Sequence, residues 1–411
     1  MDYKLNIKKK ILVVTPRFPF DLSGACEQDR SYGVRRLVEM GYEVKVIVKV
    51  WPKHLECIQE AQDFSGAEII PILYTQYQDL SDSDKKKRKI KRFTNPLYID
   101  GACFEYTEEK INRKMEEVLD KWKPDLVWFD YTYLWPLYSS VQKRKIPIIT
   151  RSINFEPIHF LEEDRYKLLN FIKFIPKVLS EIITVFKTDH MFSITPKEAK
   201  IYKFIGGFGK VSNLPLRGLP YKLRDNFEVR DKKTLDLFFM GSTYNVTHNR
   251  EALKFIVKDL ATHMNKEHEG MFRFNITGSK FPSDLEKYID GVKIIYHGYV
   301  DKDKMDEFFN NMDIALTPSF MGAGMQQKIF EPISRGIPSV ISDRTIAGYP
   351  LKDKVHYIGA KGVSGFADAL VQLSDIKMRQ SMSDHAKNKT KEIFSLEKID
   401  FILKDVLNNL L

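Results

Sequence analysis

The amino-acid sequence predicts an α/β protein made of two doubly wound, Rossmann-like parallel-sheet domains facing a cleft. A β-rich run at 10–15, a helical pattern at 26–40 and a second β-rich run at 42–50 form a strand–helix–strand unit, which implies parallel pairing with a right-handed crossover. A second alternation begins at Leu235, after a stretch rich in glycine, proline and charge at 206–234. The 411 residues exceed one ordinary core. We expect domains at 1–212 and 213–394, followed by an amphipathic helix at 395–411.

Composition places the chain among soluble globular proteins, because 43% of its residues are hydrophobic and 29% are charged. Its three cysteines, Cys26, Cys57 and Cys103, are scattered without metal-ligand spacing, which favours a reducing compartment. The basic start with its short apolar run is typical of a first strand and not of a signal peptide. No apolar run reaches the length of a membrane span. We therefore expect a cytoplasmic protein.

The formal net charge is +10, and part of it is concentrated in the run KKKRKIKR at 85–92. A basic balance is compatible with nucleic acid, an anionic membrane or an acidic substrate. No zinc spacing, aromatic RNA-binding strand or recognition-helix pattern accompanies this run, so a nucleic-acid partner is not expected. The remaining interpretations are a membrane surface and a solvated loop.

The stretch 313–342 carries the most specific functional pattern. It combines a strand at 313–317, a glycine-bearing loop at 320–324, a helix to Arg335 and a second strand from Pro338. A glycine loop that opens a helix lets backbone N–H groups approach a phosphate closely. Lys328, Glu331 and Arg335 recur at helical spacing on one face, and the alternative for them is a solvated ion-pair stripe. The opposite face has a predicted buried stripe at Met325, Ile329 and Ile333.

The sequence GAGMQQKIFEPISRGIPSVIS at 322–342 resembles the nucleotide-sugar signature of GT-B glycosyltransferases, specifically the retaining glycosyltransferase family 4 (group 1). The resemblance implies that Glu331 contacts the donor ribose and Lys328 the diphosphate, beside the loop Gly322, Ala323 and Gly324. Many members have a second Glu where this chain has Ala323. Pro332 replaces the usual Ala, so we expect the helix either to begin late or to kink there.

The same resemblance extends to other strand ends. It places Arg17, Ser23 and Gly24 in the loop below donor and acceptor. It also matches the family pattern R-x-H-N-x-E with Arg151, Asn154 and Glu156. Ile153 stands in place of the His of that pattern, and His159 is the nearest imidazole. Helix capping is the alternative role of Asn154 and Glu156. The donor base is expected at Gly278, Tyr299 and Val300, and Gly241 with Ser242 completes the donor-binding candidates. The terminal helix is expected to cross back to the first domain, which is the acceptor side.

The chemistry that the resemblance implies is retaining sugar transfer from a UDP- or GDP-linked donor to a saccharide or lipid-linked acceptor in surface polysaccharide biosynthesis. Lys328 and loop N–H groups would stabilise the departing diphosphate without a metal or a cofactor besides the donor, and Arg17 would add a second cation. Because Ala323 and Ile153 depart from the pattern, a non-catalytic GT-B subunit remains an alternative. A two-domain small-molecule binding protein is a second one.

Three further expectations concern the first half. The segment 162–186 is apolar and basic, and a break is predicted at Pro176. It can lie on a bilayer as a peripheral anchor on the inner face of the membrane, or form two helices packed on the sheet. The run 190–195 is expected to be the last strand of the first half, so that 206–234 is a linker.

Overall fold

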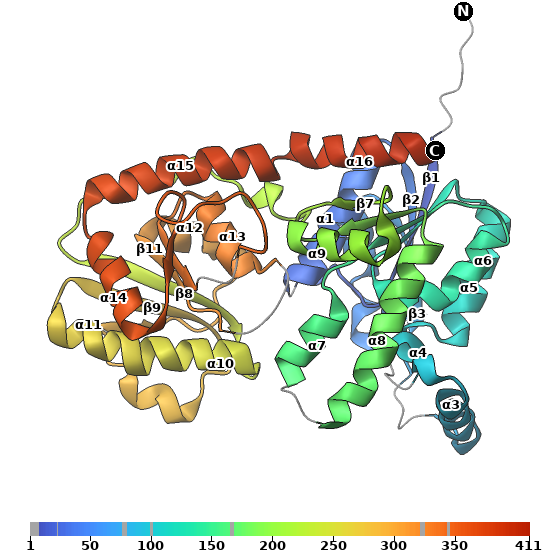
Figure 1. Cartoon of the computed structure of the whole chain (residues 1–411), viewed down its shortest axis with the longest axis horizontal. Helices are drawn as coiled ribbons and strands as arrows, with labels where there is room; N and C mark the ends of the chain where they lie inside the picture. The colour runs from blue at the N-terminus through green and yellow to red at the C-terminus, as the bar shows by residue number, and fades with distance from the viewer. Residues whose placement is uncertain are drawn as a thin grey trace, which may run out of the picture. The chain divides into compact units, whose positions relative to one another are not determined.

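The computed structural model describes residues 8–22, 24–75, 80–98, 102–164, 168–320, 325–342 and 346–411. The chain divides into two compact units (Figure 1). The first unit comprises Met1–Gly218 and Ile399–Leu411, and the second comprises Leu219–Lys398. The chain therefore leaves the first unit a few residues after the boundary predicted at 212, and it returns for its last residues.

The first unit contains a seven-stranded sheet in the order β3-β2-β1-β4-β5-β6-β7, in which every pairing is parallel. The strand order reverses direction between β1 and β4, and open parallel sheets bind ligands at the carboxyl ends beside such a point. The strands are β1 (Lys10–Thr15), β2 (Glu43–Val50), β3 (Glu68–Leu73), β4 (Leu126–Phe129), β5 (Ile148–Arg151), β6 (His190–Ser193) and β7 (Val211–Asn213).

Helices cover both faces of this sheet. One face packs against α1, α2 and α16, and the other against α5, η4 and α6. In α16 the buried residues Ile399, Leu403, Val406 and Leu407 recur at the spacing of one helical face. The helical segments are α1 (Ala25–Glu39), η1 (Pro52–His54), α2 (Ile58–Ser65), α3 (Asp82–Thr94), η3 (Pro96–Tyr98), α4 (Ala102–Tyr106), α5 (Glu109–Trp122), η4 (Thr132–Leu137), α6 (Tyr138–Gln142), α7 (Glu156–Asp164), α8 (Leu168–Lys187), α9 (Pro196–Tyr202), η5 (Lys203–Gly207) and α16 (Leu396–Leu410).

Three details of the first unit differ from the sequence expectations. The strand at 190–195 is not the last, because β7 pairs with β6 inside the predicted linker, through Met191 and Val211. Helix α8 continues through Pro176, where a break was expected. The basic run at 85–92 is not a loop but lies within α3, whose N-cap Ser81 accepts a hydrogen bond from the Asp84 N–H.

The second unit contains a six-stranded parallel sheet in the order β10-β9-β8-β11-β12-β13, and its order reverses between β8 and β11. The strands are β8 (Leu235–Thr243), β9 (Phe272–Ser279), β10 (Ile294–Tyr296), β11 (Ile314–Thr317), β12 (Ser339–Ser342) and β13 (Ile358–Ala360). The helical segments are η6 (Pro220–Lys222), α10 (Thr247–Lys254), η7 (Phe255–Leu260), α11 (Ala261–Glu267), η8 (Ser283–Tyr288), α12 (Lys302–Asn311), α13 (Gln327–Ser334), α14 (Gly362–Gln372) and α15 (Ile376–Phe394).

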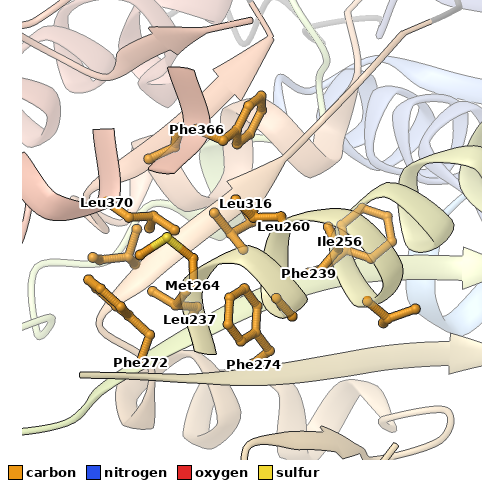
Figure 2. Packing of buried hydrophobic residues seen from close by; sticks show 14 of the residues in the cluster. Leu237, Phe239, Ile256, Leu260, Met264, Phe272, Phe274, Leu316, Phe366 and Leu370 are labelled. Atoms are coloured by element: carbon orange, nitrogen blue, oxygen red, sulfur yellow. The ribbon is translucent and has the colours of Figure 1, made fainter. Parts of the chain in front are cut away.

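The two faces of β8 build separate parts of the second core. Leu237 and Phe239 point toward η7, α11 and α14, and Figure 2 shows them packed among aromatic and aliphatic side chains from these helices and from β9. Phe238, between them, joins Phe309 and Ile337 on the opposite face. This two-residue alternation within a strand that is buried on both sides fixes its register. The polar side chains of β8 consequently lie near its two ends.

Within the part of the chain that the structure describes, none of the helices has both the length and the apolar character needed to cross a bilayer.

Candidate functional site

A lysine lies at the point where the strand order of the second sheet reverses. Lys328 comes from α13, which follows β11, and its Nζ lies 3.3 Å from Oδ1 of Asn249 in α10, which follows β8. Asn249 is buried, and its Nδ2 donates to Ser242 Oγ at 3.2 Å and to the Thr243 carbonyl at 3.1 Å. Ser242, Asn249 and Lys328 therefore form one chain of contacts across the carboxyl ends of β8 and β11. Asn249 was not expected from the sequence.

The environment of Lys328 favours an anionic ligand. Burial lowers the pKa of its ammonium to about 8, and no carboxylate contributes to this shift. The ammonium contacts the neutral Asn249 amide and lies 6.0 Å from the centre of the Phe239 ring. A cation held in a partly desolvated site by neutral groups interacts strongly with any negative charge that enters.

Helix α13 tolerates Pro332 without starting late. The helix begins at Gln327, so Pro332 lies in its interior and cannot donate to the carbonyl of Lys328. That carbonyl instead accepts a hydrogen bond from Thr317 Oγ1, at 3.3 Å, from the end of β11. The side chain of a strand residue thus replaces the missing backbone donor, and it ties the backbone of Lys328 to the sheet.

Glu331 is almost fully buried, with 2% of its surface exposed, so a solvated stripe is the wrong description of this helix. One carboxylate oxygen contacts Arg335 at 3.1 Å and Lys222 at 3.6 Å, and the other accepts from Gln327 at 2.9 Å. Arg335 also pairs with Asp306, at 2.7 Å. The carboxylate of Glu331 is therefore held by hydrogen bonds from Arg335 and Gln327 and by the charge of Lys222, whereas Lys328 turns toward α10.

The ends of β8 and β9 approach each other closely. A Cβ on Gly278, whose φ is +133°, would fall 2.8 Å from the Gly241 carbonyl oxygen, and a Cβ on Gly241 would fall 2.5 Å from the Tyr244 hydroxyl. Both positions therefore require glycine. Tyr299 and Val300 follow β10, the next strand, and Tyr299 is 59% exposed. These four candidates thus lie along the same edge of the sheet as Lys328.

Other candidates are placed differently. Gly322, Ala323, Gly324 and Ser23 lie outside the described residues. In the first unit, Gly24 is the N-cap of α1, and Arg17 is exposed and donates to the Tyr106 hydroxyl at 3.1 Å. The phenol of Tyr106 raises the pKa of Arg17, so this cation stays charged.

Arg151, which the sequence motif places beside Asn154 and Glu156, has a structural role instead. It is fully buried and pairs with Asp29 at 2.9 Å. Asp29 also pairs with Arg217 at 2.8 Å, and Arg217 reaches Asp130 at 3.0 Å. Burial would raise the pKa of Asp29, but the two guanidiniums outweigh it and hold that pKa well below its usual range. This quartet links α1, β4, β5 and the segment after β7.

Asn154 and Glu156 adjoin two further buried carboxyl groups. Glu156 is 8% exposed and begins α7, and its N–H donates to Glu181 at 3.4 Å. Burial, reinforced by the charge of Glu156, raises the pKa of Glu181 to about 8. Burial also raises the pKa of Glu198, to about 7, although it accepts from the Phe155 N–H. The Asn154 carbonyl accepts from Ser152 Oγ at 2.9 Å. Neither Glu181 nor Glu198 was expected as part of this cluster.

Among the described residues, no group of three or more His, Cys, Asp or Glu side chains is arranged to hold a metal ion.

Part of the second unit matches a known protein family. Residues 234–375 match the family model described as glycosyl transferases group 1. None of the curated proteins matches the sequence. The resemblance inferred from the 322–342 motif is confirmed at the level of group 1.

Several solved structures are similar in fold to nearly the whole chain. Sucrose-phosphate synthase from Thermosynechococcus elongatus is 12% identical with a TM-score of 0.65, covering 98% of this chain and 99% of its own. HepE of Anabaena, in complex with UDP and glucose, is 9% identical with a TM-score of 0.63, covering 98% and 100%. The lipopolysaccharide outer core galactosyltransferase WaaB is 13% identical with a TM-score of 0.59, covering 97% and 99%. The predicted GT-B fold class is confirmed.

Proposed function

We propose that the chain is a retaining glycosyltransferase that moves a hexose or related sugar from a UDP- or GDP-linked donor to a saccharide or lipid-linked acceptor, in surface polysaccharide biosynthesis. The observation that carries this proposal is the half-buried Lys328 ammonium, held by a neutral amide at the strand-order reversal of the sheet that matches the group 1 family model. HepE, a protein of the same fold, has been solved with UDP and glucose, and WaaB is named a galactosyltransferase, which supports a hexosyl donor of the UDP type.

The proposed reaction follows from what each group can do. The bond between the anomeric carbon and the diphosphate oxygen breaks, and a bond from that carbon to the acceptor oxygen forms on the same face. The acceptor proton passes to the departing phosphate oxygen. Lys328 and the first N–H groups of α13 stabilise the negative charge that develops there, so the scheme needs no metal ion.

Donor binding is assigned along the same strand-end edge. Glu331 accepts from the ribose hydroxyls, and its contacts with Arg335, Gln327 and Lys222 fix its orientation beforehand. Gly241, Ser242 and Gly278 allow the donor to approach the backbone, and Tyr299 with Val300 receives the base. In the first unit, Arg17, Asn154 and Glu156 are assigned to the acceptor side.

The test is a calorimetric titration of the whole chain with UDP-, GDP- and ADP-sugars, followed by a turnover assay. We expect one nucleotide class to bind tightly. Lys328→Met and Glu331→Gln should each weaken binding by roughly 1.5–3 kcal/mol, the cost of one charge-assisted hydrogen bond. Lys254→Met, at an exposed lysine of α10, is the control and should bind as the parent does.

Three outcomes separate the alternatives. Binding without turnover in the presence of saccharide and lipid-linked acceptors would favour the non-catalytic GT-B subunit. Absence of binding to every nucleotide sugar would favour the small-molecule binding protein. Parent-like binding by both Lys328→Met and Glu331→Gln would remove these residues from the donor site.

A further inference from the structure

Six large apolar side chains of the first unit are exposed on α8 and on η5 with the residue that follows it. Phe204 and Phe208 are each 91% exposed, so their rings make almost no contact with the rest of the unit. The apolar patch, as we call this set, consists of Ile172, Ile175, Leu179, Phe186, Phe204 and Phe208. Single exposed apolar residues are ordinary, but a group of six on adjoining elements marks an interaction site.

The members of the apolar patch on α8 form one stripe. Ile172, Ile175, Leu179 and Phe186 are spaced by three, four and seven residues, so they share one helix face over about 21 Å. The phenylalanines outside α8 extend this stripe at its carboxyl end. A Cβ on Gly206 would fall 2.7 Å from the Phe186 ring, which places the η5 backbone between Phe204 and Phe208 against the end of α8.

Helix α8 has the reverse of the usual amphipathic arrangement. Its inward face is mostly polar, although Val185 is buried there. Lys177 donates to the Tyr133 hydroxyl at 3.1 Å, and Thr184 donates to the Thr132 carbonyl at 2.9 Å. Glu181, also on this face, is fully buried. An ordinary surface helix buries its apolar stripe and exposes its polar one. Because buried hydrogen bonds fix the orientation of α8, the helix cannot rotate to hide the apolar patch without breaking them.

Cations accompany the apolar patch. Exposed lysines are the direct chain neighbours of three of its members, namely Lys173 beside Ile172, Lys187 beside Phe186 and Lys203 beside Phe204. Lys210 donates to the carbonyl oxygens of Phe186 and Thr188, at 3.3 and 2.9 Å, and so holds the end of α8. An apolar face bordered by lysines is complementary to a bilayer of anionic lipids, in which the apolar side chains enter the acyl boundary and the ammonium groups remain at the phosphates.

We propose that the apolar patch docks the first unit on an anionic lipid bilayer, with Phe204 and Phe208 as the inserted side chains. Helix α3 is a second candidate contact with the bilayer, and both α3 and α8 pack against η3. On α3, Ile90 and Phe93 are exposed one turn apart, among the lysines and arginines of 85–92. The docking is separate from sugar transfer, because none of the patch residues belongs to the candidate donor site.

The experiment is co-sedimentation of the whole chain with phosphatidylcholine vesicles, with and without phosphatidylglycerol, at low and high salt. We expect binding to anionic vesicles that weakens as salt rises. The double variant Phe204→Ser with Phe208→Ser should lower the partition coefficient by at least about tenfold, given the transfer free energy of an apolar side chain. Phe401→Ser is the matched control, because Phe401 is 67% exposed on α16 and lies outside the apolar patch.

A second measurement tests insertion directly. Phe208→Trp should show blue-shifted emission and quenching by brominated lipid only with anionic vesicles. The inference is overturned by parent-like partitioning of the double serine variant, by equal binding to neutral and anionic vesicles, or by no binding at low salt. It is also overturned if the apolar patch instead joins two copies of the chain, so that the double variant changes the oligomeric state and not vesicle binding. Donor titration of the same variants should match the parent.

Discussion

The two units place cations in contrasting surroundings. In the first unit, Arg151 and Arg217 meet the carboxylates of Asp29 and Asp130. In the second, Lys328 meets the neutral amide of Asn249. The field of a buried cation is largely cancelled when carboxylates pair with it, so that the cation mainly stabilises the fold. A half-buried cation held by neutral groups, such as Lys328, can still attract an incoming anion. Burial alone therefore does not identify a binding residue, and the partner of the charge has to be known.

The largest effect is expected from a substitution that breaks the quartet of paired charges around Asp29. Asp29→Asn should lower the free energy of unfolding by about 3–5 kcal/mol, because it leaves two buried guanidiniums without their shared carboxylate. Urea denaturation measures this change. The control is Asp63→Asn at an exposed position of α2, which should change stability by no more than about 0.5 kcal/mol. If both variants unfold alike, the quartet does not brace the first unit.

The next largest effect is a pH dependence of UDP affinity, which we expect because burial lowers the pKa of Lys328 to about 8. Below pH 8 the ammonium is charged and attracts a diphosphate, and above it the charge is lost, so UDP affinity should fall about tenfold by pH 9. Stability should change in the opposite direction. The unfolded state keeps this proton up to its ordinary pKa, so the free energy of unfolding contributed by Lys328 rises between pH 8 and 10.

Calorimetry of UDP binding and urea denaturation across this pH range measure the two slopes. Lys328→Met should remove both of them. An unchanged pH dependence of UDP affinity in Lys328→Met would assign the titration to another group.

A third effect concerns the buried carboxyl groups of the first unit. Glu181 binds a proton in the folded state up to a pKa of about 8, whereas the unfolded state releases it near the usual value. The folded state therefore holds more protons in this window, and stability should fall with rising pH, by up to about 1.4 kcal/mol per unit. In Glu181→Gln this fall should be smaller, with a remainder from Glu198. A steeper fall in the variant would contradict the assignment.

The smallest effect concerns the hydrogen bond that replaces the missing backbone donor of Pro332 in α13. Thr317→Val should cost about 1 kcal/mol of stability, since it removes the hydrogen bond to the Lys328 carbonyl that Pro332 leaves without a backbone donor. Pro332→Ala restores an N–H in the helix. The cost of Thr317→Val should consequently be smaller in the Pro332→Ala background, and a double-mutant cycle measures the difference.

Much of the fold could be predicted, because the parallel strands at 10–15, 235–240 and 272–277 are apolar runs bounded by turn residues. The short strand β7 could not, since three residues carry no periodicity. Pro176 predicts a break because proline usually ends a helix, but α8 continues through it and is hydrogen-bonded to η4. In the candidate site, Lys328 and Glu331 could be proposed from a contiguous motif, and their roles stay a prediction. Asn249 and the Asp29 quartet depend on residues far apart in the chain, which no local pattern brings together.

The return of α16 to the first unit has a consequence for the order of synthesis. The second unit is inserted between residues 218 and 399 of the first. When the ribosome has made the first sheet, the four apolar side chains of α16 that will cover part of it do not yet exist. At a synthesis rate of about 5–20 residues per second, that face of the sheet stays without α16 for on the order of 10–40 s. During this time the second unit emerges and can fold. Factors that bind nascent apolar surface would therefore meet this chain at the β1–β2 face.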